Sequence, residues 1–383
     1  MISSQQPSGI TASQVLAVPF MVLAFGFAGC GSGTSNGADS GNPSGSTEVS
    51  EWGPVQTHAG EAQGTTYSIK YLSESRLEDS VFEDLLKTVD QEVSLWLPGS
   101  QINAINQWGR TDSLYGFVDS DQIIGPLWAL SEELNELTRG AFDPTVSPLV
   151  ELWGFGLSKR GEVTQERVDS VLAYTGLRPE RFDMNEEESN GMYQRTWVRK
   201  GHPNAALDFN AIAQGYTVDL LLEELRLRGV MNAMVELGGE VVCRGVNASG
   251  NPWRIAVDRP LAGTGASDRV LETVVSVKDR AICTSGNYRK FYEQGGRRYS
   301  HTIDPATGYP AENGLLSATV LAPSAAYADA LATAFMVLGA EQTQGFLATY
   351  PGLGLDVLLM SDDGEGGYTL WETPGFKAVS API

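Results

Sequence analysis

Consecutive strand-like segments without helices between them constrain the fold of this chain most strongly. Runs of apolar or alternating residues typical of strands cover 232–246, 253–258, 270–278 and 317–322. Parallel neighbours would need a crossover connection, usually a helix, between successive strands. The order therefore predicts an α+β fold built mainly from antiparallel sheet, and it argues against a doubly wound parallel fold.

Helices are predicted where apolar residues recur every three or four positions. This spacing places helices at 81–93, 124–137, 212–228 and 327–338. Glycine follows or ends the last three, as Gly140, Gly229 and Gly339. Further strands are expected at 65–72 and 355–360. Because no linker-like stretch interrupts residues 61–383, we expect one compact unit of two intimate lobes.

The first 60 residues have the composition of an export signal followed by a tether. Residues 1–30 contain no charged side chain, and the apolar run at 15–28 is shorter than the roughly 20 residues that cross a bilayer. A run of that length suits a signal peptide, although no positive charge precedes it. Small residues before Cys30 are typical of a lipoprotein signal. We therefore expect a signal peptide at 1–29, a lipidated Cys30 in a Gly/Ser-rich tether at 30–60, and a folded unit at 61–383. A disordered N-terminus without an anchor is the alternative.

The charge balance excludes one class of partner. With 26 basic and 47 acidic side chains, the net charge of -21 excludes a nucleic-acid binder that relies on bulk positive charge. Most of the acidic side chains are expected to be solvated surface, and affinity for divalent cations is the alternative. The three cysteines are too few for a disulfide framework. Cys243 and Cys283 could pair in an oxidising compartment or remain buried thiols.

Three segments in the first two thirds of the chain carry residue types expected at a ligand site. The first, AFDPTVSPLVELWGFG at 141–156, presents Asp143 from a loop rich in Gly, Pro and aromatic residues. The second, LDFNAIAQGYTVD at 207–219, places Asp208 where it can cap a helix or lie near a bound anion. In the third, VELGGE, Gly238 and Gly239 indicate either a bulge or a close approach of the backbone to a ligand.

Two later segments add hydroxyl groups, a histidine and a candidate metal pair. The small and hydroxyl residues of TSGNY at 284–288 can turn several N–H groups toward phosphate. In SHTIDPATG at 300–308, His301 is either a general base or a hydrogen-bonded structural residue. Asp329 and Thr333 lie four residues apart on a predicted helix, so their oxygens share one face and could bind Mg²⁺. Common dinucleotide, Walker and zinc motifs are absent from the sequence.

Taken together, these segments resemble the ApbE family, the FAD:protein FMN transferases. The segments above, with ADALAT after them, occur in the family's order and spacing over about residues 60–350. The resemblance implies Mg²⁺-dependent transfer of FMN from FAD to a Thr or Ser hydroxyl of a target protein, with release of AMP. Two rival hypotheses are an Mg²⁺-dependent FAD pyrophosphatase, in which water replaces the hydroxyl, and a non-enzymatic FAD-binding lipoprotein.

The resemblance also implies roles for individual residues. Asp329, Thr333 and the backbone carbonyl of Ala211 would bind Mg²⁺, and His301 would take the proton of the target hydroxyl. Contacts to FAD are expected from Trp96, Ala141, Phe142, Asp143, Asp208, Gln214 and Ile303. Some of these positions depart from the family pattern, since Gln214 stands where many members have Lys, and Trp96 where they often have Tyr.

Partners and location are likewise implied by the resemblance. The target would be a protein such as a subunit of a sodium-pumping NADH:quinone reductase or an Rnf-type complex. The chain would act on the periplasmic side of a bacterial membrane, to which the lipid on Cys30 would attach it.

Overall fold

The computed structural model describes these residues as parts of one folded unit: 51–119, 122–157, 161–189, 193–260, 270–287, 291–294 and 297–382. The predicted signal peptide, Cys30 and the tether as far as residue 50 lie outside them. Within the described part of the chain, no helix is both long and apolar enough to cross a membrane.

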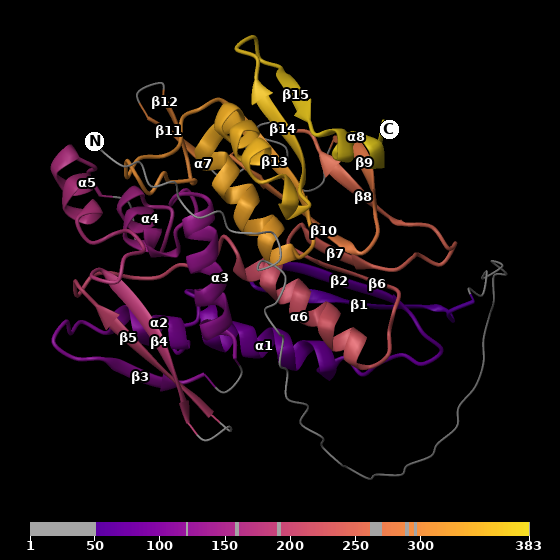
Figure 1. The fold of residues 1–383 in the computed structure, drawn as a ribbon, viewed down its shortest axis with the longest axis horizontal. Coiled ribbons are helices and arrows are strands. Elements are labelled where there is room, and N and C mark those ends of the chain that lie inside the picture. Colours follow the sequence, from indigo (N-terminus) through magenta and orange to yellow (C-terminus); the bar gives the residue numbers. More distant parts are fainter. Residues whose placement is uncertain are drawn as a thin grey trace, which may run out of the picture. The chain divides into compact units, whose positions relative to one another are not determined.

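An eight-stranded sheet forms the centre of the unit (Figure 1). Every neighbouring pair in it is antiparallel. In spatial order the strands are β1 (Val55–Ala62), β2 (Thr65–Leu72), β6 (Ala233–Leu237), β7 (Glu240–Arg244), β10 (Arg280–Gly286), β13 (Leu315–Ala322), β14 (Asp356–Asp362) and β15 (Tyr368–Glu372). The predicted α+β class with antiparallel sheet is confirmed.

Helices cover one face of this sheet. Helix α6 (Ala213–Leu227) contacts β6 and β7, and α7 (Ala325–Thr349) contacts β10 and β13 (Figure 1). Helix α1 (Ser80–Val93) packs beside α6. The apolar residues predicted to face a core do so, among them Phe82, Leu221 and Phe335, which are fully buried.

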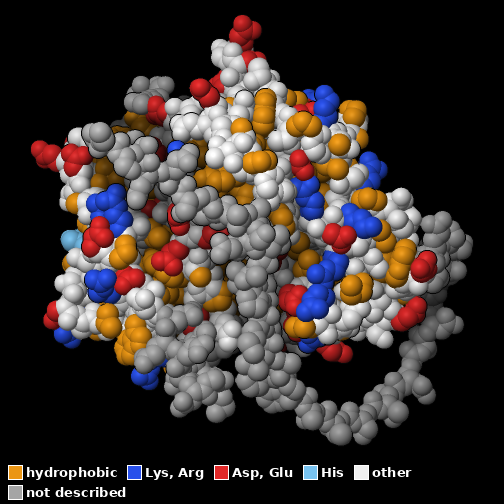
Figure 2. Space-filling view, in the orientation of Figure 1, with side chains coloured by type: hydrophobic (Ala, Val, Ile, Leu, Met, Phe, Trp, Pro, Cys, Tyr) orange, Lys and Arg blue, Asp and Glu red, His pale blue; other side chains and the backbone are white. Residues whose placement is uncertain are grey.

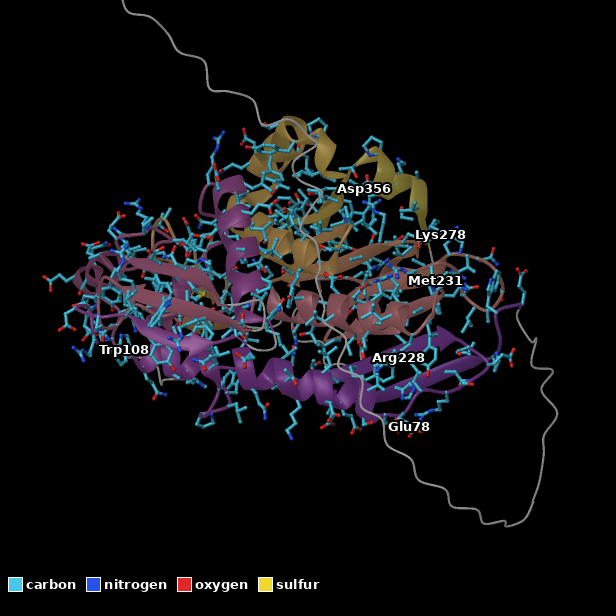
Figure 3. All side chains as sticks on the ribbon, turned by 60° about the horizontal axis from the view of Figure 1, so that its bottom comes forward. Glu78, Trp108, Arg228, Met231, Lys278 and Asp356 are labelled. Atoms are coloured by element: carbon cyan, nitrogen blue, oxygen red, sulfur yellow. The ribbon has the colours of Figure 1, made fainter. Side chains whose placement is uncertain are left out.

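The opposite face is covered by a small sheet of three strands: β16 (Ser380–Pro382), β9 (Leu271–Val277) and β8 (Trp253–Asp258). With α8 (Pro374–Val379), it forms a second apolar core against β7, β10, β13 and β14. An ion pair at 2.6 Å between Arg280 and Asp356 ties β10 to β14 beside this core, and Figure 3 labels Asp356.

The remaining elements form a second lobe that shares the main core. Its three-stranded sheet has the order β3 (Tyr115–Val118), β5 (Tyr193–Lys200) and β4 (Phe182–Ser189). Its helices are α2 (Gln101–Gln107), α3 (Ile124–Leu137), α4 (Ser147–Trp153) and α5 (Gln165–Leu172), and a hairpin of β11 (Phe291–Gln294) and β12 (Arg297–Ser300) lies near them. One hydrophobic cluster joins Leu127 of this lobe to Val235 and Phe335 of the other, as expected for intimate lobes.

Three local expectations are corrected by the structure. Gly238 and Gly239, both with positive φ, form the turn of a hairpin between β6 and β7 and not a bulge within one strand. Gly339 breaks the helical geometry of α7 as predicted, but helix resumes after it and continues to Thr349. Thr284, Ser285 and Gly286 lie in β10 and pair with β13, so their backbone is extended rather than curled toward a phosphate.

The folded unit begins earlier than the predicted boundary at residue 61. Residues 55–60 belong to β1, which pairs with β2 along its whole length. His58, which lies within the predicted tether, is buried in this strand, where its ring contacts Asp79 and lies 3.1 Å from the hydroxyl of Tyr71. The last third of the predicted tether is therefore partly built into the sheet.

Cys243 and Cys283 are free thiols. Cys243 belongs to the core shared with the small sheet, whereas Cys283 belongs to the core under the helices. Because the central sheet separates them, the structure supports buried thiols over the alternative of a disulfide.

Candidate active site

Helices α6 and α7 meet over β7 and bring together residues that the sequence placed in separate segments. The N–H of Gly215 on α6 donates to Asp329 Oδ2 on α7 at 3.0 Å. A Cβ at position 215 would lie 2.3 Å from the carbonyl oxygen of Ala325, so a side chain there would force the helices apart. Ala211, the predicted carbonyl ligand, lies four residues before Gly215. The absence of a Cβ at position 215 therefore lets α6 and α7 approach closely at the junction where Asp329 lies.

Asp219 fixes the start of α7 at the same junction. Its two carboxylate oxygens accept hydrogen bonds from the N–H groups of Ala325 and Ala326, each at 2.9 Å. Burial raises the pKa of Asp219 to about 7. Sequence reasoning missed this residue, although its position one turn after Gly215 placed it on the same face of α6.

Asp329 and Thr333 lie one turn apart on α7 and face the interior of the site. Asp329 is buried, and this burial raises its pKa to about 7, with a further contribution from the charge of Asp219. The hydroxyl oxygen of Thr333 lies 3.0 Å from that of Ser285 on β10. One carboxylate and two hydroxyls are therefore held between the helices and the sheet.

The raised pKa of Asp329 predicts that cation binding depends on pH. Since a carboxylate binds Mg²⁺ only when ionised, the rise in thermal midpoint caused by Mg²⁺ should be small at about pH 5.5 and grow up to about pH 8. The ion-free chain should behave in the opposite way. The pKa of Asp329 in the folded chain exceeds its unfolded value of about 3.9. The free energy of unfolding of the ion-free chain therefore falls between about pH 4 and pH 7. Thermal melts across this range, with and without Mg²⁺, test both expectations, and a Mg²⁺ effect independent of pH would contradict them.

Glu240 lies at the same junction and was not among the predicted site residues. It begins β7, directly after the Gly238–Gly239 turn, and it is buried. A Cβ on Gly238 would lie 3.0 Å from Gln214 Nε2 and 3.2 Å from Glu240 Oε2, so these two side chains converge on one point. Burial raises the pKa of Glu240, and the negative charge of Asp329 adds to the effect. Its place beside the paired glycines of VELGGE was the available signal.

A second group of predicted residues is held by contacts between segments that are far apart in the sequence. Trp153 of α4 donates its indole N–H to the carbonyl oxygen of Gly308 at 2.7 Å. Ile303 packs into the same apolar cluster as Trp153. The rings of Phe155 and His301 lie edge to face, with centroids 6.4 Å apart. The predicted residues His301 and Ile303 therefore stand on a loop that α4 holds in place.

The carboxylate of Asp143 accepts hydrogen bonds from its own loop and from Leu177, which follows α5. Its Oδ1 accepts hydrogen bonds from the N–H and the hydroxyl of Thr145, and its Oδ2 accepts one from the N–H of Leu177. Burial raises the pKa of Asp143. Ala141 and Phe142, just before it, are also buried. The structure thus shows Asp143 holding the loop, whereas contact of these three residues with FAD stays a prediction.

Asp208 does not cap α6, because its Oδ1 accepts from the N–H of Asn210 in a local turn before the helix. Its own N–H donates to the carbonyl oxygen of Pro144 at 2.7 Å, which ties it to the Asp143 loop. Asn106 of α2, missed by sequence reasoning, holds the neighbouring residue: its side-chain amide makes two hydrogen bonds of 2.8 Å with the N–H and C=O of Leu207. Two distant segments, the Asp143 loop and α2, therefore help to position Asp208.

Trp96 lies between α1 and α2 with 66% of its surface exposed. Such an exposed aromatic ring can stack on a planar ligand, but no described contact places it at the helix junction.

Figure 2 shows acidic and basic side chains both scattered over the visible face, in keeping with a mostly solvated set of acidic residues.

The donor set at the junction suits a hard cation that keeps part of its water. No group of three or more His, Cys, Asp or Glu side chains with metal-binding geometry is found among the described residues. Mg²⁺ commonly takes one or two protein carboxylates and completes its shell with water and substrate phosphates. Asp329, the Thr333 hydroxyl and the Ala211 carbonyl fit that requirement, whereas they would not satisfy a zinc site.

The antiparallel α+β fold of this unit is shared with solved flavin transferases. The structure named Flavin Transferase ApbE from Vibrio cholerae matches with a TM-score of 0.70 and 34% identity, over 85% of this chain and 100% of that chain. The apo form of the Pseudomonas stutzeri flavinyl transferase ApbE also gives 0.70, at 32% identity over 85% and 96% of the two chains.

The family model described as ApbE family matches residues 63–358, and this chain belongs to that family. Among its relatives, the FAD:protein FMN transferase of Vibrio cholerae serotype O1 is 36% identical over 319 residues, which cover 81% of this chain and 89% of the relative. That of Haemophilus influenzae is 33% identical over 314 residues, or 80% and 87% of the two chains. The resemblance inferred from the sequence is confirmed.

Proposed function

We propose that this chain is an FAD:protein FMN transferase that requires Mg²⁺ and attaches FMN to a Thr or Ser hydroxyl of a target protein. The observation that carries the proposal is the junction of α6 and α7, where Asp329 is held by Gly215 and Thr333 faces Ser285. Relatives that align with about four fifths of the chain bear the name of this activity.

Different residues of the site would bind the metal and transfer the proton. Asp329, Thr333 and the Ala211 carbonyl would hold Mg²⁺, which would neutralise charge on the FAD pyrophosphate. His301 would accept the proton as the target hydroxyl oxygen bonds to the phosphorus of the FMN half. The bond from that phosphorus to the AMP oxygen breaks in line, and AMP leaves. Burial of the junction strengthens these charge interactions by excluding water.

The remaining predicted residues would hold the flavin nucleotide. We propose that Trp96 stacks on the flavin and that Gln214, which has no charge, donates a hydrogen bond to an FAD oxygen. Ala141, Phe142, Asp208 and Ile303 would line the binding surface. The Asp143 carboxylate already accepts three hydrogen bonds, so its contribution would come from shaping the loop.

A single incubation tests the proposal against its two rivals. The full-length chain is mixed with FAD, Mg²⁺ and a target domain that bears a flavinylation-site threonine. Transferase activity gives AMP together with flavin fluorescence that stays with the denatured target on a gel. Free FMN and AMP without labelled target would indicate a pyrophosphatase, and FAD binding without AMP release a carrier.

We also propose that the chain acts on the periplasmic side of a membrane, attached through Cys30. The apolar run at 15–28 and the small residues before Cys30 support this location. Subunits of a sodium-pumping NADH:quinone reductase or an Rnf-type complex would be its targets there. Expression of Cys30→Ala should move the protein from the membrane to the soluble fraction, and unchanged membrane association would contradict the anchor.

A further inference from the structure

Glu240 has an environment that is unfavourable for a carboxylate without a cationic partner. Only 9% of the residue is exposed, and within the described part of the chain Oε2 has no hydrogen-bond partner. Burying a polar group without such a partner costs free energy, and an ionised one costs more. A buried carboxylate therefore calls for a positive partner or for protonation.

The side chain points toward the helix junction. Side chains alternate along β7, and Val241 and Cys243 pack into the core shared with the small sheet, whereas Val242 packs into the core under the helices. Glu240 thus lies on the same face as Val242, beneath α6 and α7. Its Oε2 and the amide of Gln214 converge on Gly238.

The neighbouring charges do not compensate Glu240. The charged groups that act on it are Asp329 and Glu236, both acidic, and Gln214 is neutral. Two buried carboxylates, Asp329 and Glu240, therefore share one junction, and among the residues that the structure describes no basic side chain compensates them. A divalent cation bound there would satisfy both.

We propose that Glu240 supplies a second carboxylate to the divalent cation that Asp329 and Thr333 hold, an inference that rests on the proposed function. The residues implied by the family resemblance include one carboxylate for the metal. Two carboxylates remain within the number that Mg²⁺ accepts while leaving positions for water and phosphate. Glu240 would raise the affinity of the free protein for the cation before FAD arrives.

Binding of Mn²⁺ to the full-length chain without FAD, measured by electron paramagnetic resonance, tests the inference directly. Glu240→Gln keeps the shape of the side chain and removes its charge. We expect the Kd for Mn²⁺ to rise about tenfold or more, within the range seen when groups supporting a metal site are removed. The thermal midpoint of the ion-free protein should not fall, because a buried unpaired charge has been removed.

Glu236→Gln is the matched control. Glu236 lies on the same hairpin but pairs with Val241, so its side chain is on the opposite face of the sheet. Its substitution removes the same charge, and the Kd should change by less than about twofold, because the half-buried Glu236 carboxylate lies across the sheet from the cation, where it cannot be a ligand, and charge interactions weaken with distance. If both variants weaken Mn²⁺ binding equally, a general charge effect replaces the proposed contact and the inference is wrong.

Two further variants separate the possible failures. Gln214→Lys places an ammonium beside Glu240 and should also weaken Mn²⁺ binding, which tests the inference with Glu240 intact. Asp329→Asn should abolish binding. If Asp329→Asn loses binding but Glu240→Gln retains the wild-type Kd, Glu240 is not a ligand. If neither affects binding, the cation site of the proposed function is itself misplaced.

Discussion

Asp329→Asn is expected to lower the rate of FMN transfer by about 10²–10³-fold, the scale of loss when a preorganised charge-stabilising group is removed from a catalytic site. The substitution preserves the size of the side chain and its ability to accept the hydrogen bond from Gly215. What it removes is the carboxylate charge that would hold Mg²⁺. Transfer is measured from the increase of target-bound flavin fluorescence at saturating FAD.

Asp84→Asn, on the exposed surface of α1, is the control for this variant. It makes the same change of charge away from the helix junction, so transfer should continue at the wild-type rate. Retention of full activity in Asp329→Asn would show that the metal assignment is wrong. If excess Mg²⁺ restored part of the rate, weakened cation binding would be the cause of the loss.

Gly215→Ala is expected to have the largest effect on stability. The added methyl group would lie 2.3 Å from the Ala325 carbonyl oxygen and 2.8 Å from the Asp329 Cβ, so α6 and α7 must separate. Overpacking of this kind costs about 1–3 kcal/mol of the free energy of unfolding. Because Gly215 also donates to Asp329, cation affinity should fall as well. Urea denaturation of the ion-free protein gives the change in stability.

Gly345→Ala is the matched control, since Gly345 lies in α7, the helix that Gly215 of α6 approaches, and no neighbouring atom lies within 4 Å of an added Cβ there. There, alanine should raise the stability by up to about 1 kcal/mol through its better helix propensity. A gain in stability at position 215 equal to that at position 345 would mean that helix propensity, and not the close approach of the helices, dominates there.

Local patterns in the sequence predicted the elements that have strong local signals. Strand β2 and helix α1 appear where alternation and helical spacing placed them, because each buries one apolar face. Most of strand β1 lies within the predicted tether, and its sequence, VQTHAGEA, has few apolar residues that would indicate a strand. Its place in the sheet comes from backbone pairing with β2 and from the buried contacts of His58, which are tertiary effects.

Local sequence patterns likewise predicted only part of the candidate site. The Asp329–Thr333 pair was found because both residues lie on one helix, where a spacing of four has a fixed geometry. The two hydrogen bonds between Asn106 and Leu207 join residues 101 positions apart, and no local pattern reveals them. Glu240 was overlooked for a related reason: the paired glycines predicted either a bulge or a ligand contact, whereas they form a hairpin that turns Glu240 under the helices.

The placement of the two cysteines on opposite faces of the sheet affects how the protein withstands its chemical surroundings. Burial raises the pKa of both thiols, so little reactive thiolate is present at neutral pH. Thiols that are shielded and kept apart can neither cross-link nor undergo ready oxidation. The described fold therefore holds both cysteines as thiols and does not rely on a disulfide between them.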